Sequence, residues 1–295
     1  MTNAVLYVFY TSPRTCALRL KLMRSINPNV RFYGLCTDRP ENIHKFKPVF
    51  DELDDAWVFP FVNPKWHWHN LDKVVCTWFV ERGANLPFDR LLVLDWDVLL
   101  LNPVSTWTSL VDERSAKFID VWENTQPETN HWTRSTNEEF VSFCARYDAR
   151  NGTRPVIYNA FLFAYVVPRR AFTDCAQEVL GYAGYCEYRL PTILRSYGYD
   201  LENLPRPQNW YKFANVKGIS ITAGLILDEM ARPDGFRLFH PVFEPYHSSD
   251  LWMSLPDRIA ARFRYRNVSR LVKEVLKRCL RRARSWRLDD DSQAT

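Results

Sequence analysis

The chain lacks the features of a disulfide-bonded or membrane-spanning protein. Its seven cysteines are odd in number and scattered, and no two of them form a Cys-x-x-Cys pair. We therefore expect reduced, mostly buried thiols. The first residues carry no basic lead and no apolar run of signal-peptide length, and no later stretch is long enough to span a bilayer. A cytoplasmic protein is expected, unless an anchor precedes this sequence.

Internal repeats, low-complexity tracts and a clean interdomain linker are also missing. A hydrophobic fraction of 46% over 295 residues is ordinary for a globular chain with a large core. We predict one α/β domain over residues 1–256, a basic extension over 257–288 and a polar tail over 289–295.

The basic extension carries most of the positive charge. Residues 257–288 hold twelve Lys or Arg against Asp257 and Glu274, while the whole chain has a net charge of +5, so the rest of the chain is mildly acidic. Apolar residues recur there at spacings of three and four, as in an amphipathic helix. Such a helix can lie peripherally on an anionic membrane, dock on the domain or bind RNA. Because the positive charge is confined to one end, no nucleic-acid partner is expected.

Strands and helices alternate in the predicted secondary structure of the N-terminal part. Apolar runs predict strands over 5–9 and 30–36, and apolar periodicity predicts helices over 16–26 and 71–82. This β-α-β-α order is the signature of a parallel, doubly wound sheet. Farther along we predict a strand region over 156–167, helices over 170–181 and 187–197, and a strand over 236–239.

The segment from Arg90 to Pro103 is the most informative in the chain. Residues 91–94 are continuously apolar, as in a central parallel strand covered on both faces. Asp95 and Asp97 follow at the carboxyl end of this strand, the edge where open α/β sheets bind ligands. Residues two apart in an extended chain face the same way, so both carboxylates can converge on one divalent cation.

Asp95, Trp96 and Asp97 resemble the DxD motif of GT-A glycosyltransferases, and the likeness extends to the preceding helix and strand and, more loosely, to residues 4–247. It implies a GT-A fold and a Mn²⁺ or Mg²⁺ ion that neutralises the diphosphate leaving a nucleotide-sugar, with UDP expected. It implies a glycan or glycolipid hydroxyl as acceptor. Asp97 would bind the metal directly, and Asp95 would contact the ribose or the metal's water shell.

The same resemblance assigns further residues. A third metal ligand is expected from a C-terminal histidine: His240, directly after a predicted strand, is preferred to His247, which could instead contact donor sugar or acceptor. The nucleotide would be bound by positions around the first strands and the motif. These positions are Phe9, Tyr10, Thr11, Arg14, Asp38, Lys73, Asp95 and Trp96.

An inverting enzyme also needs a base for the acceptor hydroxyl. Glu187 is the candidate, because its neighbourhood resembles an acidic motif of inverting members, although Tyr188 stands where a second acidic residue is usual. The alternative is a helix-start carboxylate favoured by the helix dipole and paired with Arg189. Asn159 resembles a donor-sugar contact, and Asp120 or Glu123 could replace Glu187. Polar residues 125–155 are expected to form a flap on the acceptor side.

Two other functions remain open on sequence grounds. An apolar strand followed by Asp-x-Asp also resembles the haloacid dehalogenase-type phosphatases, in which Asp95 would be the nucleophile. That family needs a later lysine and a further acidic pair after a strand, whereas the acidic run 289–291 lies in a polar tail. The other possibility is a non-catalytic protein that binds nucleotide-sugars.

Overall fold

The computed structural model describes residues 1–60, 64–205, 209–210, 221, 226, 229–232 and 235–242. His247, the basic extension 257–288 and the polar tail 289–295 lie outside these residues, so the predictions made for them remain predictions.

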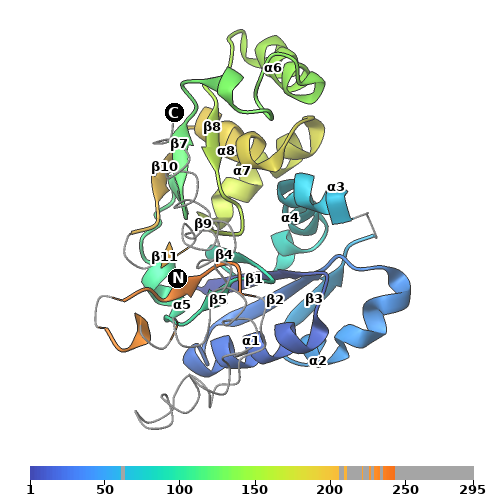
Figure 1. Ribbon diagram of the computed structural model, residues 1–295, viewed down its shortest axis with the longest axis vertical. Coiled ribbons are helices and arrows are strands. Elements are labelled where there is room, and N and C mark those ends of the chain that lie inside the picture. The colour runs from blue at the N-terminus through green and yellow to red at the C-terminus, as the bar shows by residue number, and fades with distance from the viewer. Residues whose placement is uncertain are drawn as a thin grey trace, which may run out of the picture.

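A seven-stranded sheet forms the centre of the domain (Figure 1), with strand order β10-β6-β9-β4-β1-β2-β3. All neighbouring pairs are parallel except those made by β9, which runs antiparallel to β4 and to β6. The α/β class and the mainly parallel sheet predicted from the sequence are therefore confirmed. The strands are β1 (Asn3–Phe9), β2 (Arg31–Cys36), β3 (Asp55–Val58), β4 (Arg90–Asp95), β6 (Ser115–Phe118), β9 (Ala164–Pro168) and β10 (Asp200–Asn203).

Helices cover both faces of this sheet, because side chains of the central strands alternate between two apolar cores. In β1, Leu6 and Val8 belong to one core and Val5 and Tyr7 to the other. The helices, in chain order, are α1 (Pro13–Ile26), α2 (Lys47–Phe50), α3 (Pro64–His69), α4 (Leu71–Glu81), α5 (Val104–Thr108), α6 (Glu138–Asn151), α7 (Arg169–Gly181) and α8 (Cys186–Ser196).

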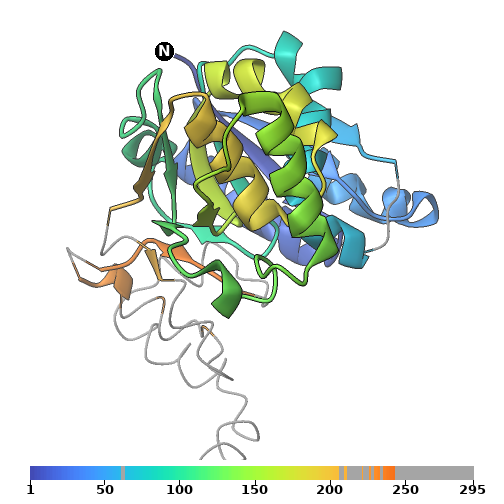
Figure 2. The ribbon, with the colours of Figure 1, turned by 90° about the horizontal axis from the view of Figure 1, so that it is seen from above.

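The two faces carry different helices. On the first face α4, α7 and α8 pack against the core that contains Leu6, while α1, α2 and α5 pack against the core that contains Val5. Figure 2 shows α6 and α8 together over the first face, and Phe140 and Phe143 of α6 each lie 5.3 Å from the ring of Tyr188 in α8. Every apolar face of the central strands is thus covered, as their continuous hydrophobicity requires.

Two small sheets extend the domain. In one, β12 (Leu238–Phe239) pairs antiparallel with β5 (Leu99–Leu100) and parallel with β11 (Asn209–Trp210). In the other, β7 (Val121–Glu123) pairs antiparallel with β8 (Tyr158–Ala160). The first of these sheets brings the late segment 238–242 back against the chain that follows β4.

Two sequence expectations are corrected here. The apolar run 156–167 is not one strand but two, β8 and β9, which belong to different sheets. Residues 125–155, expected as a flap, contain the 14-residue helix α6, which Asn137 caps by accepting a hydrogen bond from the backbone N–H of Phe140. Half of that segment is therefore a packed helix, because Phe140 and Phe143 supply it with an apolar face.

The described cysteines agree with the expectation of reduced thiols. All six are unpaired, and five of them are buried, Cys144 being the partly exposed one. Within the described residues, no helix combines the length and apolarity needed to cross a membrane.

A fully buried ion pair fixes α8 against α4. Arg189 donates from Nε to Oδ2 of Asp72 over 2.8 Å and from Nη2 to Oδ1, and both side chains are fully shielded from solvent. Its remaining donors bond the carbonyl of Gly184 and the side chain of Asn70. Every charged atom of the pair is thus hydrogen-bonded, which is the condition for tolerating buried charge.

Removing one partner of this pair should be costly. We expect Arg189→Met to lower the free energy of unfolding by about 3–5 kcal/mol in urea, because it strands the carboxylate of Asp72 in the core. Asp72→Leu combined with Arg189→Met should recover part of that loss. The control is Lys47→Met, since the exposed pair of Lys47 and Asp51, 2.9 Å apart, is worth about 1 kcal/mol at most. Equal losses for Arg189→Met and Lys47→Met would contradict this account.

Candidate functional site

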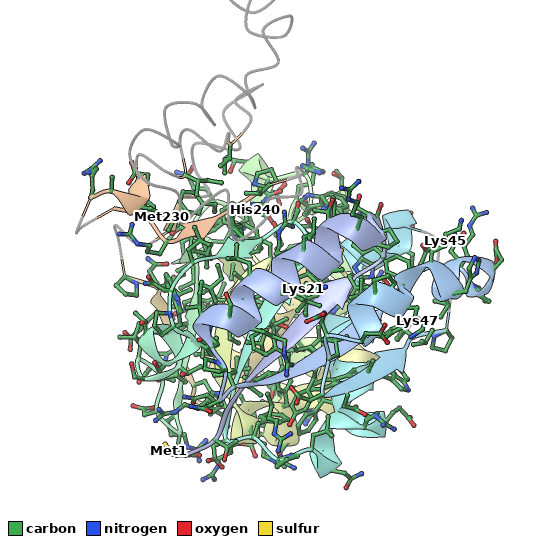
Figure 3. The ribbon with its side chains drawn as sticks, turned by 90° about the horizontal axis from the view of Figure 1, so that it is seen from below. Met1, Lys21, Lys45, Lys47, Met230 and His240 are labelled. Carbon is green, nitrogen blue, oxygen red and sulfur yellow. The ribbon has the colours of Figure 1, made fainter. Side chains whose placement is uncertain are left out.

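The carboxyl ends of β1, β2 and β4 meet at one edge of the sheet. The strand register places Val8 opposite Asp95 and Phe9 opposite Cys36. The residues that follow these strands therefore gather at this edge, as in other open α/β sheets. In Figure 3, His240 lies at the end of the domain opposite to Met1, which precedes β1, so the late segment reaches the same edge.

Asp95 is the last residue of β4 and turns toward its own backbone. Its Oδ1 accepts a hydrogen bond from the backbone N–H of Trp96 over 2.8 Å, and its backbone N–H donates to the carbonyl of Phe163 over 2.8 Å. Burial raises the pKa of this carboxyl well above its ordinary value, and the charge of Asp97 raises it further. Asp95 therefore shapes the turn that carries Asp97.

Arg19 of α1 holds this turn in place. Its guanidinium donates to the carbonyl of Trp96, which also accepts from the hydroxyl of Tyr7 over 2.9 Å, and to the carbonyl of Val242 over 2.6 Å. Sequence reasoning missed Arg19. The available signal was its place on the apolar face of the helix, three residues after Cys16 and four before Met23, where a buried arginine must find carbonyl or carboxylate partners.

Asp97 and His240 form the central pair of the site. Oδ1 of Asp97 lies 3.4 Å from Nε2 of His240, and their side chains are 13% and 14% exposed. The pairing of β5 with β12 and a 2.8 Å hydrogen bond from the N–H of Val242 to the carbonyl of Asp97 bring the two together. The ring of His240 stacks on that of Phe163, with centroids 3.6 Å apart and planes within 5°.

Both members of this pair keep unused polar atoms. Among the described residues, neither Oδ1 of Asp97 nor Nδ1 of His240 has a hydrogen-bond partner, although both atoms are buried. The described part of the chain holds no group of three or more His, Cys, Asp or Glu arranged to bind a metal ion, so Asp95 does not complete a triad with this pair. Within the described residues, the pair therefore offers two ligands, one carboxylate and one imidazole.

The expected nucleotide-binding residues divide into exposed and buried ones. Tyr10 is half-buried, with its ring 6.1 Å from that of Trp96 and edge-on to it. Thr11 and Arg14 flank the start of α1, and the side chain of Arg14 is exposed. Phe9 is fully buried, and its ring lies 5.3 Å from that of Phe46. The side chain of Phe9 thus belongs to the core, and Tyr10 is the aromatic residue at the edge.

Asp38 and Lys73 have structural surroundings of their own. Oδ1 of Asp38 accepts hydrogen bonds from the N–H of Arg39 over 2.6 Å and from the side chain of Asn42 over 3.1 Å. Lys73 is half-buried on α4, where burial and the nearby charge of Arg189 lower the pKa of its ammonium. Neither observation joins these residues to the pair of Asp97 and His240.

His67 of α3 also lies at this edge and was not anticipated. It is 3% exposed, its Nδ1 is 3.1 Å from the hydroxyl of Thr37, and its ring centroid is 4.6 Å from that of Tyr10. Burial lowers its pKa to about 4, so the imidazole is neutral near pH 7. The surrounding Trp-His-Trp-His run has no clear apolar periodicity, and only the fold brings His67 to the ends of β1 and β2.

Glu187 lies in the first turn of α8 and is partly buried. Burial raises its pKa to about 7, and a hydrogen bond with the side chain of Tyr185 opposes that effect. The possible pairing with Arg189 is wrong, because the guanidinium of Arg189 is taken by Asp72. Glu187 is therefore a carboxyl group whose protonation changes near neutral pH, a property suited to acid–base chemistry.

The remaining sugar-contact candidates lie on or beside β7 and β8. Asn159 is 4% exposed, and its Nδ2 has no partner among the described residues. Glu123 is exposed, and its carboxylate is 3.5 Å from the hydroxyl of Tyr158. The carbonyl of Asp120 accepts from the N–H of Phe161 over 3.2 Å. Phe161 in turn lies 5.9 Å from Phe163, the ring on which His240 stacks.

Comparisons with known proteins leave the family open. No protein-family model matches the chain, and no curated protein matches its sequence. One solved structure with a similar fold is described as the apo structure of the WbbM bifunctional glycosyltransferase. It is 12% identical, with a TM-score of 0.43, and the match covers 82% of this chain and 46% of that one. The chain thus spans under half the length of that protein, and so weak a likeness carries no argument about function.

The neutral state of His67 should appear in the stability of the protein. Because its folded pKa, about 4, lies below its ordinary value of 6.5, the unfolded chain binds more protons between these values. Stability is then complete above pH 6.5 and falls as the pH drops toward 4. We expect a loss of up to about 3 kcal/mol relative to His67→Gln in urea unfolding over this range. Other titrating groups are common to both proteins and cancel, so a difference independent of pH would contradict the assignment.

Proposed function

We propose that the chain is a metal-dependent glycosyltransferase of the GT-A type, which moves a monosaccharide from a nucleotide diphosphate sugar, UDP-sugar foremost, to a glycan or glycolipid hydroxyl. The observation that carries this proposal is the pair of Asp97 and His240 at the carboxyl edge of the sheet, 3.4 Å apart, with buried polar atoms that have no hydrogen-bond partner among the described residues. The acidic turn, residues 95–97, follows the central strand β4, and His240 reaches it from a distant segment of the chain.

A Mn²⁺ or Mg²⁺ ion fits this donor set. Mg²⁺ is usually held by one or two carboxylates together with substrate phosphates and water, not by a cage of protein side chains, and carboxylate oxygens also suit Mn²⁺. Asp97 and His240 would hold the ion, and the diphosphate would supply further oxygens. A bound ion would stabilise negative charge on the departing diphosphate. Two other residues orient these ligands. Phe163 supports the ring of His240, and Arg19 fixes the turn that carries Asp97.

The nucleotide would lie along the ends of β1 and β2. Tyr10 offers a ring at this edge, and Thr37 and His67 offer a hydroxyl and an imidazole beside it. Asp95 would face the ribose or the water shell of the ion. Glu187 would take the proton of the acceptor hydroxyl, since a carboxylate with a pKa of about 7 is a stronger base than an ordinary one.

The phosphatase alternative lacks a further part that the resemblance requires. That family needs an acidic pair after a later strand, whereas the acidic run 289–291 lies in a polar tail of the sequence. A non-catalytic nucleotide-sugar-binding protein would share the binding site and differ only in the absence of transfer. Peripheral membrane contact through 257–288 would bring the enzyme to glycolipid acceptors.

Thermal unfolding with nucleotides tests the binding half of this proposal. UDP at 100 times its dissociation constant should raise the melting temperature by on the order of 5 °C, and only with Mn²⁺ or Mg²⁺ present. Asp97→Ala and His240→Ala should abolish the shift, because each removes an ion ligand. Asp51→Ala, which removes an exposed carboxylate far from the motif in sequence, should keep it. A melting-temperature shift of equal size without metal, or an unchanged shift in Asp97→Ala, would contradict the proposed metal site.

The pH profile of transfer tests the role of Glu187. If its carboxylate is the base, kcat/KM should fall about tenfold per pH unit below 7 and level off above it. Glu187→Gln should lower kcat by about 10²–10⁴-fold and leave the shift caused by UDP and Mn²⁺ unchanged. Full activity of Glu187→Gln would rule out this role, and Asp120→Asn and Glu123→Gln would then be measured in its place.

A further inference from the structure

Aromatic side chains from three distant segments converge beside Glu187. Trp68 and His69 come from α3, Trp132 from the segment before α6, and Tyr185 from the residue before α8. The ring of Trp132 stacks on Tyr185, with centroids 4.5 Å apart and planes at 21°. Trp68 meets Tyr185 at 5.2 Å and Trp132 at 5.7 Å, and His69 meets Trp132 at 4.4 Å. We refer to Trp68, His69, Trp132 and Tyr185 as the aromatic cluster.

The aromatic cluster runs from the core to the surface. Tyr185 is 4% exposed, Trp132 is partly buried, and Trp68 is 53% exposed, the most exposed tryptophan of the described residues. Packing accounts for Tyr185 and Trp132, which both adjoin the core on the α4 face. Half of the Trp68 side chain is left in water, so one part of its indole is open to a ligand while its neighbours hold the rest.

The chain links the cluster to both parts of the proposed site. His67, the residue before Trp68, contacts Tyr10, and Tyr10 contacts Trp96, which lies between Asp95 and Asp97. Tyr185 directly precedes α8, whose first turn carries Glu187, the proposed base. The cluster is therefore joined to residues of the nucleotide side through Trp68 and to the base side through Tyr185.

An exposed aromatic face with polar groups at its margin matches the two surfaces of a pyranose ring. The axial C–H groups of such a sugar form an apolar face that packs on an indole, while its hydroxyls point outward and need hydrogen-bond partners. His69 supplies a polar group within the cluster, and exposed His131 lies beside it, with its ring 4.1 Å from that of Trp132. Glu187 follows two residues after Tyr185. A protein partner would need a larger apolar patch than one indole offers.

We propose that the aromatic cluster is the acceptor subsite, in which the exposed face of Trp68 stacks on a pyranose ring of a glycan and presents its hydroxyl toward Glu187. This inference rests on the proposed function and assigns that function's acceptor as a saccharide with an accessible C–H face. Trp132 and Tyr185 act as positioning residues that hold the indole of Trp68.

Binding of the full chain to a glycan microarray, with UDP and Mn²⁺ present, tests this subsite. The wild type should bind a subset of pyranose-containing glycans. Trp68→Leu, which keeps an apolar side chain but removes the flat ring, should weaken binding at least tenfold, and Trp68→Phe less. The matched control is Trp66→Leu on the same helix, because Trp66 is 37% exposed and stacks on Phe59 outside the cluster. Its binding should stay within twofold of the wild type.

A second measurement needs no variant. Hydroxyl-radical footprinting of the wild type with the best-bound glycan should protect Trp68 from oxidation and leave Trp66 unprotected. Unchanged glycan binding by Trp68→Leu, glycan binding without protection of Trp68, or no glycan binding at all would overturn the subsite. The shift caused by UDP and Mn²⁺ in the same samples separates the two proposals: its presence without glycan binding leaves the proposed function intact, whereas glycan binding without it leaves only a carbohydrate-binding surface.

Discussion

The buried guanidinium of Arg19 ties together two segments on which the site depends. It bonds the carbonyl of Trp96, in the acidic turn after β4, and the carbonyl of Val242, just beyond β12. The two-residue pairing of β5 and β12 and the hydrogen bond from the N–H of Val242 to the carbonyl of Asp97 join the same two segments. Short ladders are marginal on their own. A single cation that bonds two carbonyls therefore helps to position Asp97 relative to His240.

Many of the aromatic side chains are arranged in rows that start near Asp97 and His240, which composition alone does not reveal. Two rows of rings lead away from the acidic turn. One runs from Trp96 through Tyr10 to His67, and the other runs from His240 through Phe163 and Phe161 to Trp122. Flat rings stack in fixed orientations and lose little side-chain entropy, so such rows stiffen the walls of a site whose polar groups must stay aligned.

The central part of the fold was predictable because its signals are local. A strand covered on both faces needs a continuous apolar run, which β4 shows between Leu91 and Leu94, and the acidic residues that follow it must lie at the sheet edge. The strands β3, β6 and β10 were missed because they are only four residues long, and because β3 is only partly buried and β10 is largely exposed. The break between β8 and β9 was missed because apolar residues fill it.

Within the site, residues placed by strand ends could be predicted, and residues placed by tertiary contacts could not. Asp95, Asp97 and His240 each follow a strand that its apolar residues reveal. Arg19 and His67 owe their importance to partners far along the chain, Trp96 and Thr37, which no local pattern connects to them. The ion pair of Arg189 with Asp72 also joins residues far apart in the sequence. Because Arg189 is bound to Asp72, it does not pair with Glu187, as one interpretation of the sequence had suggested.

The reversed direction of β9 decides which loops can serve the sheet edge. Since β9 runs opposite to β4, the residues that enter β9 lie beside those that leave β4, and Phe163 can both accept from the N–H of Asp95 and support the His240 ring. The other end of β9 meets the chain before β4, where the N–H of Arg169 donates to the carbonyl of Asp89. Insertions or deletions just before β9 would thus change the surroundings of Asp97 and His240, whereas those after β9 would change the opposite edge of the sheet.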